Sequence, residues 1–327
     1  MAVRTWALEH PHEYALIYGS PVPGYAAPEA TIGPASRVPT LLLTILAQMP
    51  GRLRAEVENE RHERMYLFDG KSFTLFAKRL NYYATVAPIL LAHMASRPVT
   101  RVRWPHGVIG DSFFEKNVPS GVPSWIERVT IDAVTYPLVP DLPTLTYLVN
   151  LNSLEFHVPQ WTVDDDGERQ NPNRLVIDLD PGKPADLHEC CQVALHLRER
   201  LGGLGLELFP VTSGSKGMQL YASLGGDLTS DQVRDLAQQL AQEMTAKHPD
   251  LVLWKMTKSL RPGKIFLDWS QNVAAKTTIS PYSLRGRDLP CVAAPRTWAE
   301  VEAGAAGRGA VAQVLERGAG VVLVLGL

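Results

Sequence analysis

Two aspartates lie two positions apart at the end of an apolar run. The run covers residues 174–182 (R-L-V-I-D-L-D-P-G) and contains Asp178 and Asp180. Alternate side chains share one face of a β-strand, so the two carboxylates should point the same way while Ile177 and Leu179 point into a core. Neighbouring carboxylates favour a proton or cation between them, and oxygen ligands of this kind suit Mg2+ or Mn2+. For this stretch alone, an acidic Pro-Gly turn without metal remains an alternative.

Two later stretches extend this chemistry. Residues 209–222 contain the turn S-G-S-K-G, in which small residues let backbone N–H groups approach an anion and Lys216 supplies a positive charge. The spacing is not that of a Walker loop, and a hairpin turn with a surface lysine is the plain alternative. Residues 257–272 run from a basic loop into a strand that ends in a third carboxylate, Asp268.

Basic residues occur in local clusters and not throughout the chain. The net charge of the 327 residues is -2, so a nucleic-acid role must depend on clusters such as Arg101 with Arg103, or Arg285 with Arg287. Phe113 and Phe114 stand near the first cluster. A Phe pair is commonly buried in a core, whereas an exposed ring can stack on an unpaired base.

The elements that must position these residues follow from periodicity. Apolar spacing predicts amphipathic helices over residues 75–93, 187–201 and 230–248, a helix from about residue 142, and a short last helix over 298–303. Strands are predicted over residues 133–139 and 154–161, and the second contains His157. A single histidine there favours a core role when it is taken alone. The charged residues 51–71 favour a solvated linker or a short helix.

Composition limits the class of protein. The chain is 45% hydrophobic and 20% charged, which is typical of a globular protein with one or two domains. Its three cysteines show no CxxC or zinc spacing, which argues for a reducing setting without structural zinc. We find no signal peptide and no apolar run long enough for a bilayer. The expected location is therefore the cytoplasm, in association with the nucleoid, with no membrane partner.

The first residues differ from the rest. Residues 6–25 (W-A-L-E-H-P-H-E-Y-A-L-I-Y-G-S-P-V-P-G-Y) are followed by an apolar helix-like stretch over 38–49. This segment resembles the C-terminal ligand-binding domain of TetR-type transcriptional regulators. Without a helix-turn-helix before it, we interpret residues 1–52 as a helical extension or remnant. A ligand-sensing protein is a further alternative.

The remaining motifs together resemble a known family. Strand-DxD, the S-G-S-K-G turn and the distant strand-Asp are typical of the archaeo-eukaryotic primase superfamily, and residues 82–300 resemble the polymerase domain of bacterial DNA ligase D. The resemblance implies an α+β primase-polymerase fold, with an antiparallel sheet core, flanking helices and a smaller N-terminal subdomain. We expect residues 53–81 to be a linker or a diverged start of this domain, and residues 301–327 to be an Ala/Gly-rich tail.

The resemblance also implies residue roles. The metal-binding and catalytic residues would be Asp178, Asp180 and Asp268, which would hold two Mg2+ or Mn2+ ions. Nucleotide contacts would come from Ser213, Lys216, Gln219, His157, Arg285, Arg287 and Lys276. DNA contacts would come from Arg103, Phe113, Phe114 and Lys116. Three departures stand out: Gln219 replaces a usual histidine, Val102 replaces a usual lysine, and the lysines expected to hold a 5′-phosphate are not recognisable in residues 55–81.

The implied activity is that of a template-dependent nucleotidyltransferase. It would fill gaps at double-strand-break ends during bacterial non-homologous end joining, with NTPs or dNTPs as substrates. The expected partners are gapped or broken DNA, Ku and a separate DNA ligase. The alternative is a catalytically weak protein that binds DNA ends.

Overall fold

A computed structural model describes residues 53–57, 64–68, 70–105, 107–108, 110–287 and 291–308. The backbone divides into two units, one formed by residues 1–85 with 325–327 and the other by residues 86–324. The predicted TetR-like segment, residues 1–52, lies outside the described residues. The same holds for the part of the predicted tail that follows residue 308.

The described part of the first unit contains a β-hairpin and most of a long helix. Strand β1 (Leu53–Val57) pairs antiparallel with β2 (Arg64–Phe68), and α4 (Gly70–Met94) follows and continues into the second unit. Where residues 51–71 are described, the predicted linker or short helix is thus wrong. Apolar and charged residues alternate in L-R-A-E-V, the pattern of a strand, and the abundance of charge obscured that period of two.

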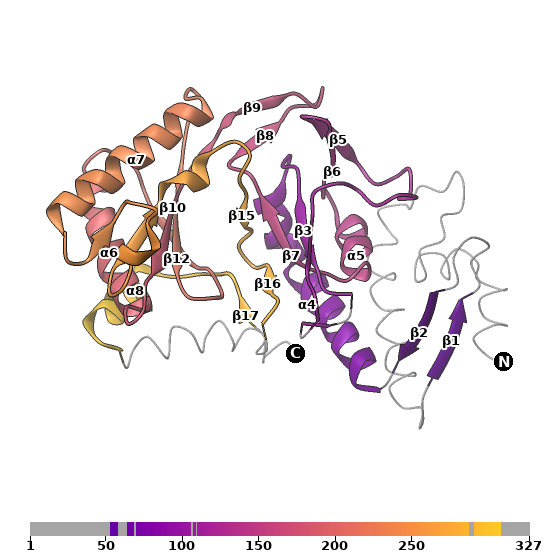
Figure 1. Cartoon of the computed structure of the whole chain (residues 1–327). Helices are drawn as coiled ribbons and strands as arrows, with labels where there is room; N and C mark the ends of the chain where they lie inside the picture. Colours follow the sequence, from indigo (N-terminus) through magenta and orange to yellow (C-terminus); the bar gives the residue numbers. More distant parts are fainter. Residues whose placement is uncertain are drawn as a thin grey trace. The chain divides into compact units, whose positions relative to one another are not determined.

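The core of the second unit is a six-stranded sheet in the order β13-β14-β10-β12-β11-β18 (Figure 1). Its pairings are antiparallel, except for the parallel pair β13 and β14. The strands are β10 (Arg174–Pro181), β11 (Phe209–Thr212), β12 (Met218–Ser223), β13 (Val252–Leu253), β14 (Ile265–Asp268) and β18 (Ala294–Pro295).

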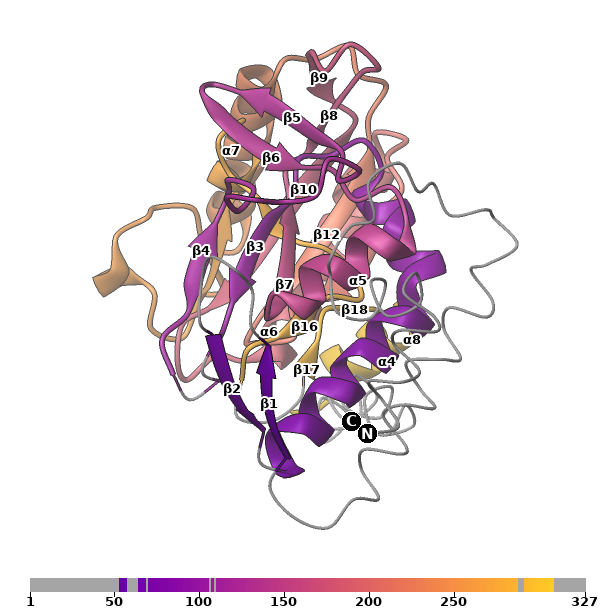
Figure 2. The ribbon, with the colours of Figure 1, turned by 90° about the vertical axis from the view of Figure 1, so that its right-hand side faces the viewer.

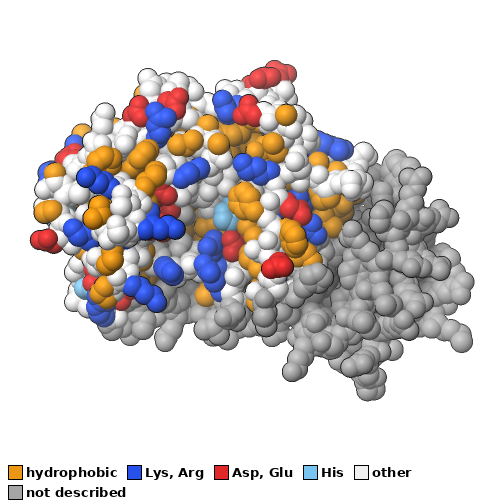
Figure 3. All heavy atoms as spheres, viewed as in Figure 1, with side chains coloured by type: hydrophobic (Ala, Val, Ile, Leu, Met, Phe, Trp, Pro, Cys, Tyr) orange, Lys and Arg blue, Asp and Glu red, His pale blue; other side chains and the backbone are white. Residues whose placement is uncertain are grey.

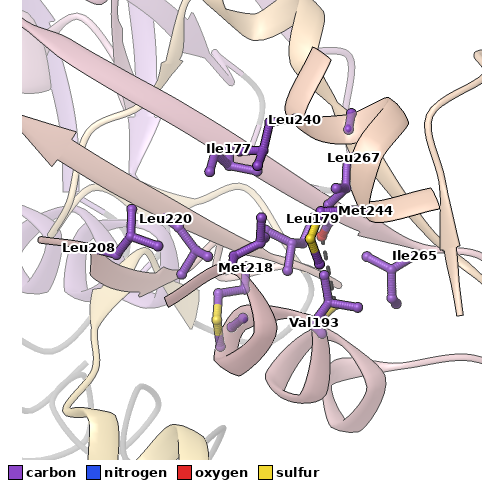
Figure 4. Packing of buried hydrophobic residues seen from close by; sticks show 14 of the residues in the cluster. Ile177, Leu179, Val193, Leu208, Met218, Leu220, Leu240, Met244, Ile265 and Leu267 are labelled. Carbon is purple, nitrogen blue, oxygen red and sulfur yellow. Dashed lines mark hydrogen bonds between the residues drawn. The ribbon is translucent and has the colours of Figure 1, made fainter. Parts of the chain in front are cut away.

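Three helices cover one face of this sheet: α6 (Leu187–Gly202), α7 (Ser230–Lys247) and α8 (Trp298–Ala306). Each begins with a capping box, because Asp186, Thr229 and Thr297 each accept from the third helical N–H and are contacted in return by a Glu or Gln side chain. Apolar side chains from the helices and from β10, β12 and β14 form the main core (Figure 4).

A four-stranded sheet stands beside the uncovered face. Its order is β15-β7-β3-β4, and α5 packs on β7 (Figure 2). The elements are β3 (Thr100–Arg103), β4 (Phe113–Glu115), α5 (Leu142–Asn150), β7 (Ser153–Val158) and β15 (Thr278–Ile279). Three two-stranded pairs complete the unit: β5 (Arg128–Ile131) with β6 (Val134–Pro137), β8 (Trp161–Val163) with β9 (Arg169–Pro172), and β16 (Leu284–Arg285) with β17 (Cys291–Val292).

Mixed helices and largely antiparallel sheets confirm the predicted α+β class. Two short 3-10 helices lie on either side of β14 in the sequence: η2 (Lys258–Leu260) precedes it and η3 (Trp269–Asn272) follows it directly. The strand therefore ends where η3 begins. In the described part of the chain, no helix is both long and apolar enough to cross a membrane.

Candidate active site

The three predicted aspartates meet on two adjacent strands. Asp178 lies directly opposite Asp268 in the antiparallel register of β10 and β14, and Asp180 lies on the same face of β10. One carboxylate oxygen from each of the three residues lies within 4.8 Å of the others. Local sequence placed the first two together, and the register of β14 adds the third.

Strand alternation explains which way they point. Leu175, Ile177 and Leu179 are buried against the helices, as expected. The residues between them face the uncovered side of the sheet, where Val176 packs in a smaller apolar cluster with Tyr221 and other residues. The carboxylates therefore leave the main core and project toward the four-stranded sheet.

The acidic cluster is electrostatically strained without a cation. Burial raises the pKa of Asp178 to about 8, and the charges of Asp180 and Asp268 add to the rise, while a hydrogen bond from Gln219 and the charge of Arg285 oppose it. Burial and Asp268 also raise the pKa of Asp180, against the charges of Arg261 and Lys216. Three carboxylates in so small a volume favour partial protonation or a bound cation.

Asp268 is held by the helix that follows it. Its Oδ1 accepts from the backbone N–H of Ser270 at 3.1 Å, and its Oδ2 accepts from Gln271 Nε2 at 2.9 Å. Lys276 Nζ lies 3.9 Å from the same Oδ2 and contacts the Ser270 hydroxyl. Lys276, predicted to bind nucleotide, is thus placed beside the carboxylate cluster.

The S-G-S-K-G turn joins β11 to β12 and closes on itself. The Ser213 N–H donates to the Gly217 carbonyl at 3.0 Å, and Ser213 Oγ accepts from the N–H groups of Ser215 and Gly217 at 3.3 Å. A Cβ on Gly217 would lie 2.1 Å from the Leu179 carbonyl oxygen, so only glycine lets the turn approach β10 this closely. Lys216 at its tip is exposed.

A cavity of about 360 Å³ opens where these elements meet. Eight of the predicted site residues line it: His157, Asp178, Asp180, Ser213, Lys216, Gln219, Arg285 and Arg287. Its lining contains both acidic and basic side chains, so it offers groups that suit a cation and groups that suit an anion. Lys and Arg side chains gather around the middle of this face of the molecule (Figure 3).

Two of the cationic lining residues are held by partners. Arg287 Nη2 donates to Ser215 Oγ at 2.7 Å, and this bond connects the segment after β16 to the S-G-S-K-G turn. Arg285 Nη1 donates to Glu155 Oε2 at 3.0 Å, and His157 Nε2 lies 2.8 Å from the same oxygen. Burial lowers the pKa of Arg285, and Glu155 counters this effect.

Gln219 occupies a buried position between Asp178 and Tyr221. Its amide donates a hydrogen bond to Asp178, and its Oε1 accepts from the Tyr221 hydroxyl at 2.8 Å. The hydroxyl also lies 3.1 Å from Thr278 Oγ1. The residue predicted to contact the triphosphate therefore also contacts an aspartate of the acidic cluster.

None of the four predicted DNA-binding residues lines the cavity, although Phe114 lies beside a residue that does. Phe114 is exposed, and its ring centroid lies 6.2 Å from that of His157. Phe113, also exposed, must point to the opposite face of β4 by strand alternation. Arg103 is on that opposite face too, where it pairs with Glu115 and the Leu151 carbonyl.

Lys116, the remaining predicted DNA-binding residue, directly follows β4 and is half-buried. It does not line the cavity.

Sequence reasoning missed the residues that orient others. Glu155, Tyr221 and Thr278 make the hydrogen bonds described above but carry no motif. Glu155 did leave one signal: an acidic residue inside the apolar strand 154–158, two positions before His157 and hence on the same face.

Comparisons with known proteins find similarity to two families. The family model described as LigD, primase-polymerase domain, matches residues 77–321, and the model described as Tetracyclin repressor-like, C-terminal domain, matches residues 1–70. A multifunctional non-homologous end joining protein LigD of Mycolicibacterium smegmatis is 46% identical over 252 residues, which cover 74% of this chain and 33% of that protein. The chain thus spans about a third of the length of this curated relative.

A solved structure and a regulator are also similar. The polymerase domain from Mycobacterium tuberculosis Ligase D in complex with DNA matches with a TM-score of 0.69 and 41% identity, over 76% of this chain and 91% of that one. This likeness confirms the primase-polymerase fold. A helix-turn-helix type transcriptional regulator of Mycobacterium bovis is 60% identical over 38 residues, which are 11% of this chain and 16% of the regulator.

Proposed function

Because the chain belongs to the LigD primase-polymerase domain family, whose members are nucleotidyltransferases, we propose that it extends a primer strand on a DNA template and fills gaps at double-strand-break ends. The observation that carries the proposal is the cluster of Asp178, Asp180 and Asp268 beside a cavity lined by Lys216 and Arg287. Nucleotidyl transfer requires this pairing, because a carboxylate-bound cation and fixed positive charges must both meet the triphosphate.

The donor set fits a hard divalent cation. Three carboxylates with oxygens within 4.8 Å of one another, two of them with raised pKa values, form an all-oxygen site with excess negative charge. We propose that these aspartates hold two Mg2+ or Mn2+ ions. When bound, such ions would neutralise charge on the triphosphate and lower the pKa of the attacking 3′-hydroxyl.

The remaining steps belong to the chain's own residues. Lys216 and Arg287 would bind the triphosphate through their charges, and Ser213, which lines the same cavity, would contact it beside them. Gln219 would keep the Asp178 carboxylate oriented. Phe114, exposed beside His157, would stack on a base at the cavity mouth.

Partners and context are also part of the proposal. The solved relative is a complex with DNA, and the curated relatives are non-homologous end joining proteins. We infer that the substrates here are gapped or broken DNA with NTPs or dNTPs, and that Ku and a separate DNA ligase act alongside, in the cytoplasm near the nucleoid.

The domain organisation is proposed on the same basis. The polymerase domain would occupy residues 82–300, after a diverged start over 53–81, and residues 1–52 would be a TetR-like extension without a role in polymerisation. Limited proteolysis tests this assignment: removal of residues 1–52 should leave primer extension unchanged. Loss of activity on that cleavage would contradict it.

The deciding experiment is primer extension on a gapped duplex that carries a 5′-phosphate, with NTPs or dNTPs and Mn2+. The wild type should extend the primer, and Asp178→Ala/Asp180→Ala should not. A matched control is Asp165→Ala/Asp166→Ala, two exposed aspartates of the acidic turn before β9, which should extend normally. A folded wild type that binds DNA without extending it would overturn the polymerase and leave a protein that only binds ends.

A further inference from the structure

One asparagine side chain takes the place of a strand residue beside β10. Asn272 is the last residue of η3 and is only 1% exposed. Its Oδ1 accepts from the Val176 N–H at 3.0 Å, and its Nδ2 donates to the Val176 carbonyl oxygen at 2.8 Å. A single amide thus satisfies both main-chain groups of a residue 96 positions earlier in the chain.

The register of β10 and β14 explains why a side chain is needed there. β14 ends at Asp268, opposite Asp178, whereas β10 extends beyond this pair, where β14 no longer accompanies it. Successive residues of an antiparallel strand direct their main-chain groups to opposite sides, so Val176 and Asp178 offer theirs to the same side. The Asn272 amide supplies the donor and the acceptor that a further residue of β14 would have supplied.

The turn that contains Asn272 also presents Asp268. Asp268 is the N-cap residue of η3, and its Oδ1 accepts from the Ser270 N–H at 3.1 Å. Asn272 Nδ2 donates in addition to the Trp269 carbonyl oxygen at 3.1 Å, which connects the end of the turn to its beginning. One short turn therefore presents one carboxylate of the acidic cluster and binds the strand that presents the other two.

Burial makes the bonds to Val176 hard to replace. Val176 is fully buried, so its N–H and its carbonyl group cannot exchange the Asn272 amide for bulk water. Val176 precedes Asp178 by two positions and shares its face of β10, so a shift of the strand at Val176 would move the Asp178 carboxylate as well. The spacing of carboxylate oxygens in turn determines how well they bind one cation together.

We propose that Asn272 is a positioning residue of the acidic cluster. It holds Asp178 opposite Asp268 and thereby raises the affinity of the cluster for a divalent cation. Asn272 does not line the cavity, so it acts through the main chain of β10 and not through contact with the cation. This inference rests on the proposed function, which assigns cations to these aspartates, and deepens it.

The test is calorimetric titration of Mn2+ into the full chain, as wild type and as Asn272→Leu, in parallel with primer extension. Leucine has the same branched shape without any hydrogen-bonding group, so it removes the bonds to Val176 and Trp269 and adds no charge. We expect an affinity for Mn2+ about tenfold weaker than that of the wild type, because the two bonds that hold β10 are lost. Urea unfolding of both proteins establishes that the titrations compare folded chains.

A variant that lowers stability elsewhere separates positioning from folding. Val301 lies on α8, which packs on α6, and its side chain is buried in the main core. Val301→Ala should lower the urea unfolding midpoint through lost packing, but it should bind Mn2+ like the wild type. If Asn272→Leu does not fold, Asn272→Ala removes the amide without adding bulk, and it should weaken the affinity for Mn2+ in the same direction.

A measurement on the wild type alone tests the coupling in the other direction. If the bonds between Asn272 and β10 strengthen cation binding, a bound cation must strengthen those bonds to the same degree. Saturation with Mg2+ should therefore slow amide hydrogen exchange of the Val176 N–H by about tenfold, as measured by NMR. The N–H of Leu197, in the middle of α6, is the comparison and should slow less.

Each outcome decides one question. Equal Mn2+ affinities of the wild type and a folded Asn272→Leu would overturn the inference, and so would an equally large loss of affinity in Val301→Ala. Exchange of the Val176 N–H that is unaffected by Mg2+ would overturn it as well. A wild type that binds Mn2+ but extends no primer contradicts the proposed function instead, and the weaker affinity of Asn272→Leu would then still support the inference.

Discussion

The Tyr221 hydroxyl donates to Gln219 Oε1 at 2.8 Å, and this bond sets the direction of the Gln219 amide. With its oxygen occupied, the amide turns its NH2 group toward Asp178. The Tyr221 phenol, two positions further along β12, thus affects the acidic cluster indirectly, through the side chain of Gln219.

Tyr221→Phe should therefore weaken metal binding. Loss of the hydroxyl frees the Gln219 amide to rotate and costs about one hydrogen bond, or about 1 kcal/mol, which corresponds to a roughly fivefold weaker affinity for Mn2+. Calorimetric titration of Mn2+ measures it without catalysis. Tyr147→Phe, on α5 in contact with Trp125, is the matched control and should titrate like wild type. Equal affinities for wild type and Tyr221→Phe would refute the coupling.

Gly217→Ala should damage both the turn and the fold. The new Cβ would fall 2.1 Å from the Leu179 carbonyl, so β10 and the turn must separate, at about 1–3 kcal/mol. Urea unfolding measures the loss. Gly202→Ala, where the added carbon would meet no heavy atom within 4 Å beyond its chain neighbours and its own helix backbone, should be neutral or slightly stabilising. Similar midpoints for both variants would contradict the close approach.

Lys216→Met should raise KM for the nucleotide about tenfold with a smaller effect on kcat, because a charge-assisted phosphate contact is lost. Steady-state extension with varied nucleotide measures both constants. Lys247→Met removes a lysine of α7 that pairs with Glu243 and serves as the control. An unchanged KM in the Lys216 variant would remove this turn from the triphosphate site.

Phe114→Ala and Phe113→Ala should differ although the residues are adjacent. Only Phe114 shares a face with His157, so its loss should weaken extension of a gapped substrate about tenfold, which corresponds to one lost stacking contact. Phe113→Ala should have a much smaller effect. Extension rates at subsaturating DNA, measured for each variant in parallel, make the comparison. A larger loss of extension in Phe113→Ala would contradict the assignment of faces.

The stability of the protein should fall in mild acid through His93. Burial lowers the pKa of its imidazole, and the charges of Arg174 and Arg97 lower it further. Since the folded pKa lies below the unfolded value, the stabilising contribution is present above about pH 6.5 and is lost as the pH falls through the folded pKa.

His93→Gln should flatten this dependence. Urea unfolding midpoints at pH 8 and pH 5.5 measure this pH dependence. Between pH 8 and pH 5.5 the midpoint of the variant should fall less than the midpoint of the wild type. Parallel pH dependence of the two proteins would show that His93 takes up its proton equally in both states.

The sequence predicted those parts of the site that depend on strand alternation or on a local turn. The shared face of Asp178 and Asp180, the burial of Ile177 and Leu179, and the S-G-S-K-G turn all follow from neighbours in the chain. The position of Asp268 opposite Asp178 depends on the register of β14, which local pattern does not contain. The family resemblance supplied it.

Other misplacements have equally physical causes. Arg103 belongs to a basic cluster in the sequence, yet Glu115 on the next strand pairs with it on the face away from the cavity. Phe113 and Phe114 were assigned one role, although adjacent residues of a strand cannot share a face. Glu155 escaped notice because a buried carboxylate is recognised by its donors, and these come from a segment far along the chain.

The pairing of Asp178 with Asp268 also has a consequence during synthesis on the ribosome. The chain emerges from its N-terminus, so β10, β12 and the S-G-S-K-G turn are made well before β14. A nascent chain that has reached only α7 contains Lys216 and two of the three carboxylates of the acidic cluster, but not Asp268. Completion of the acidic cluster is thus a late event in the synthesis of each molecule, and the proposed catalytic centre is incomplete until β14 has been made.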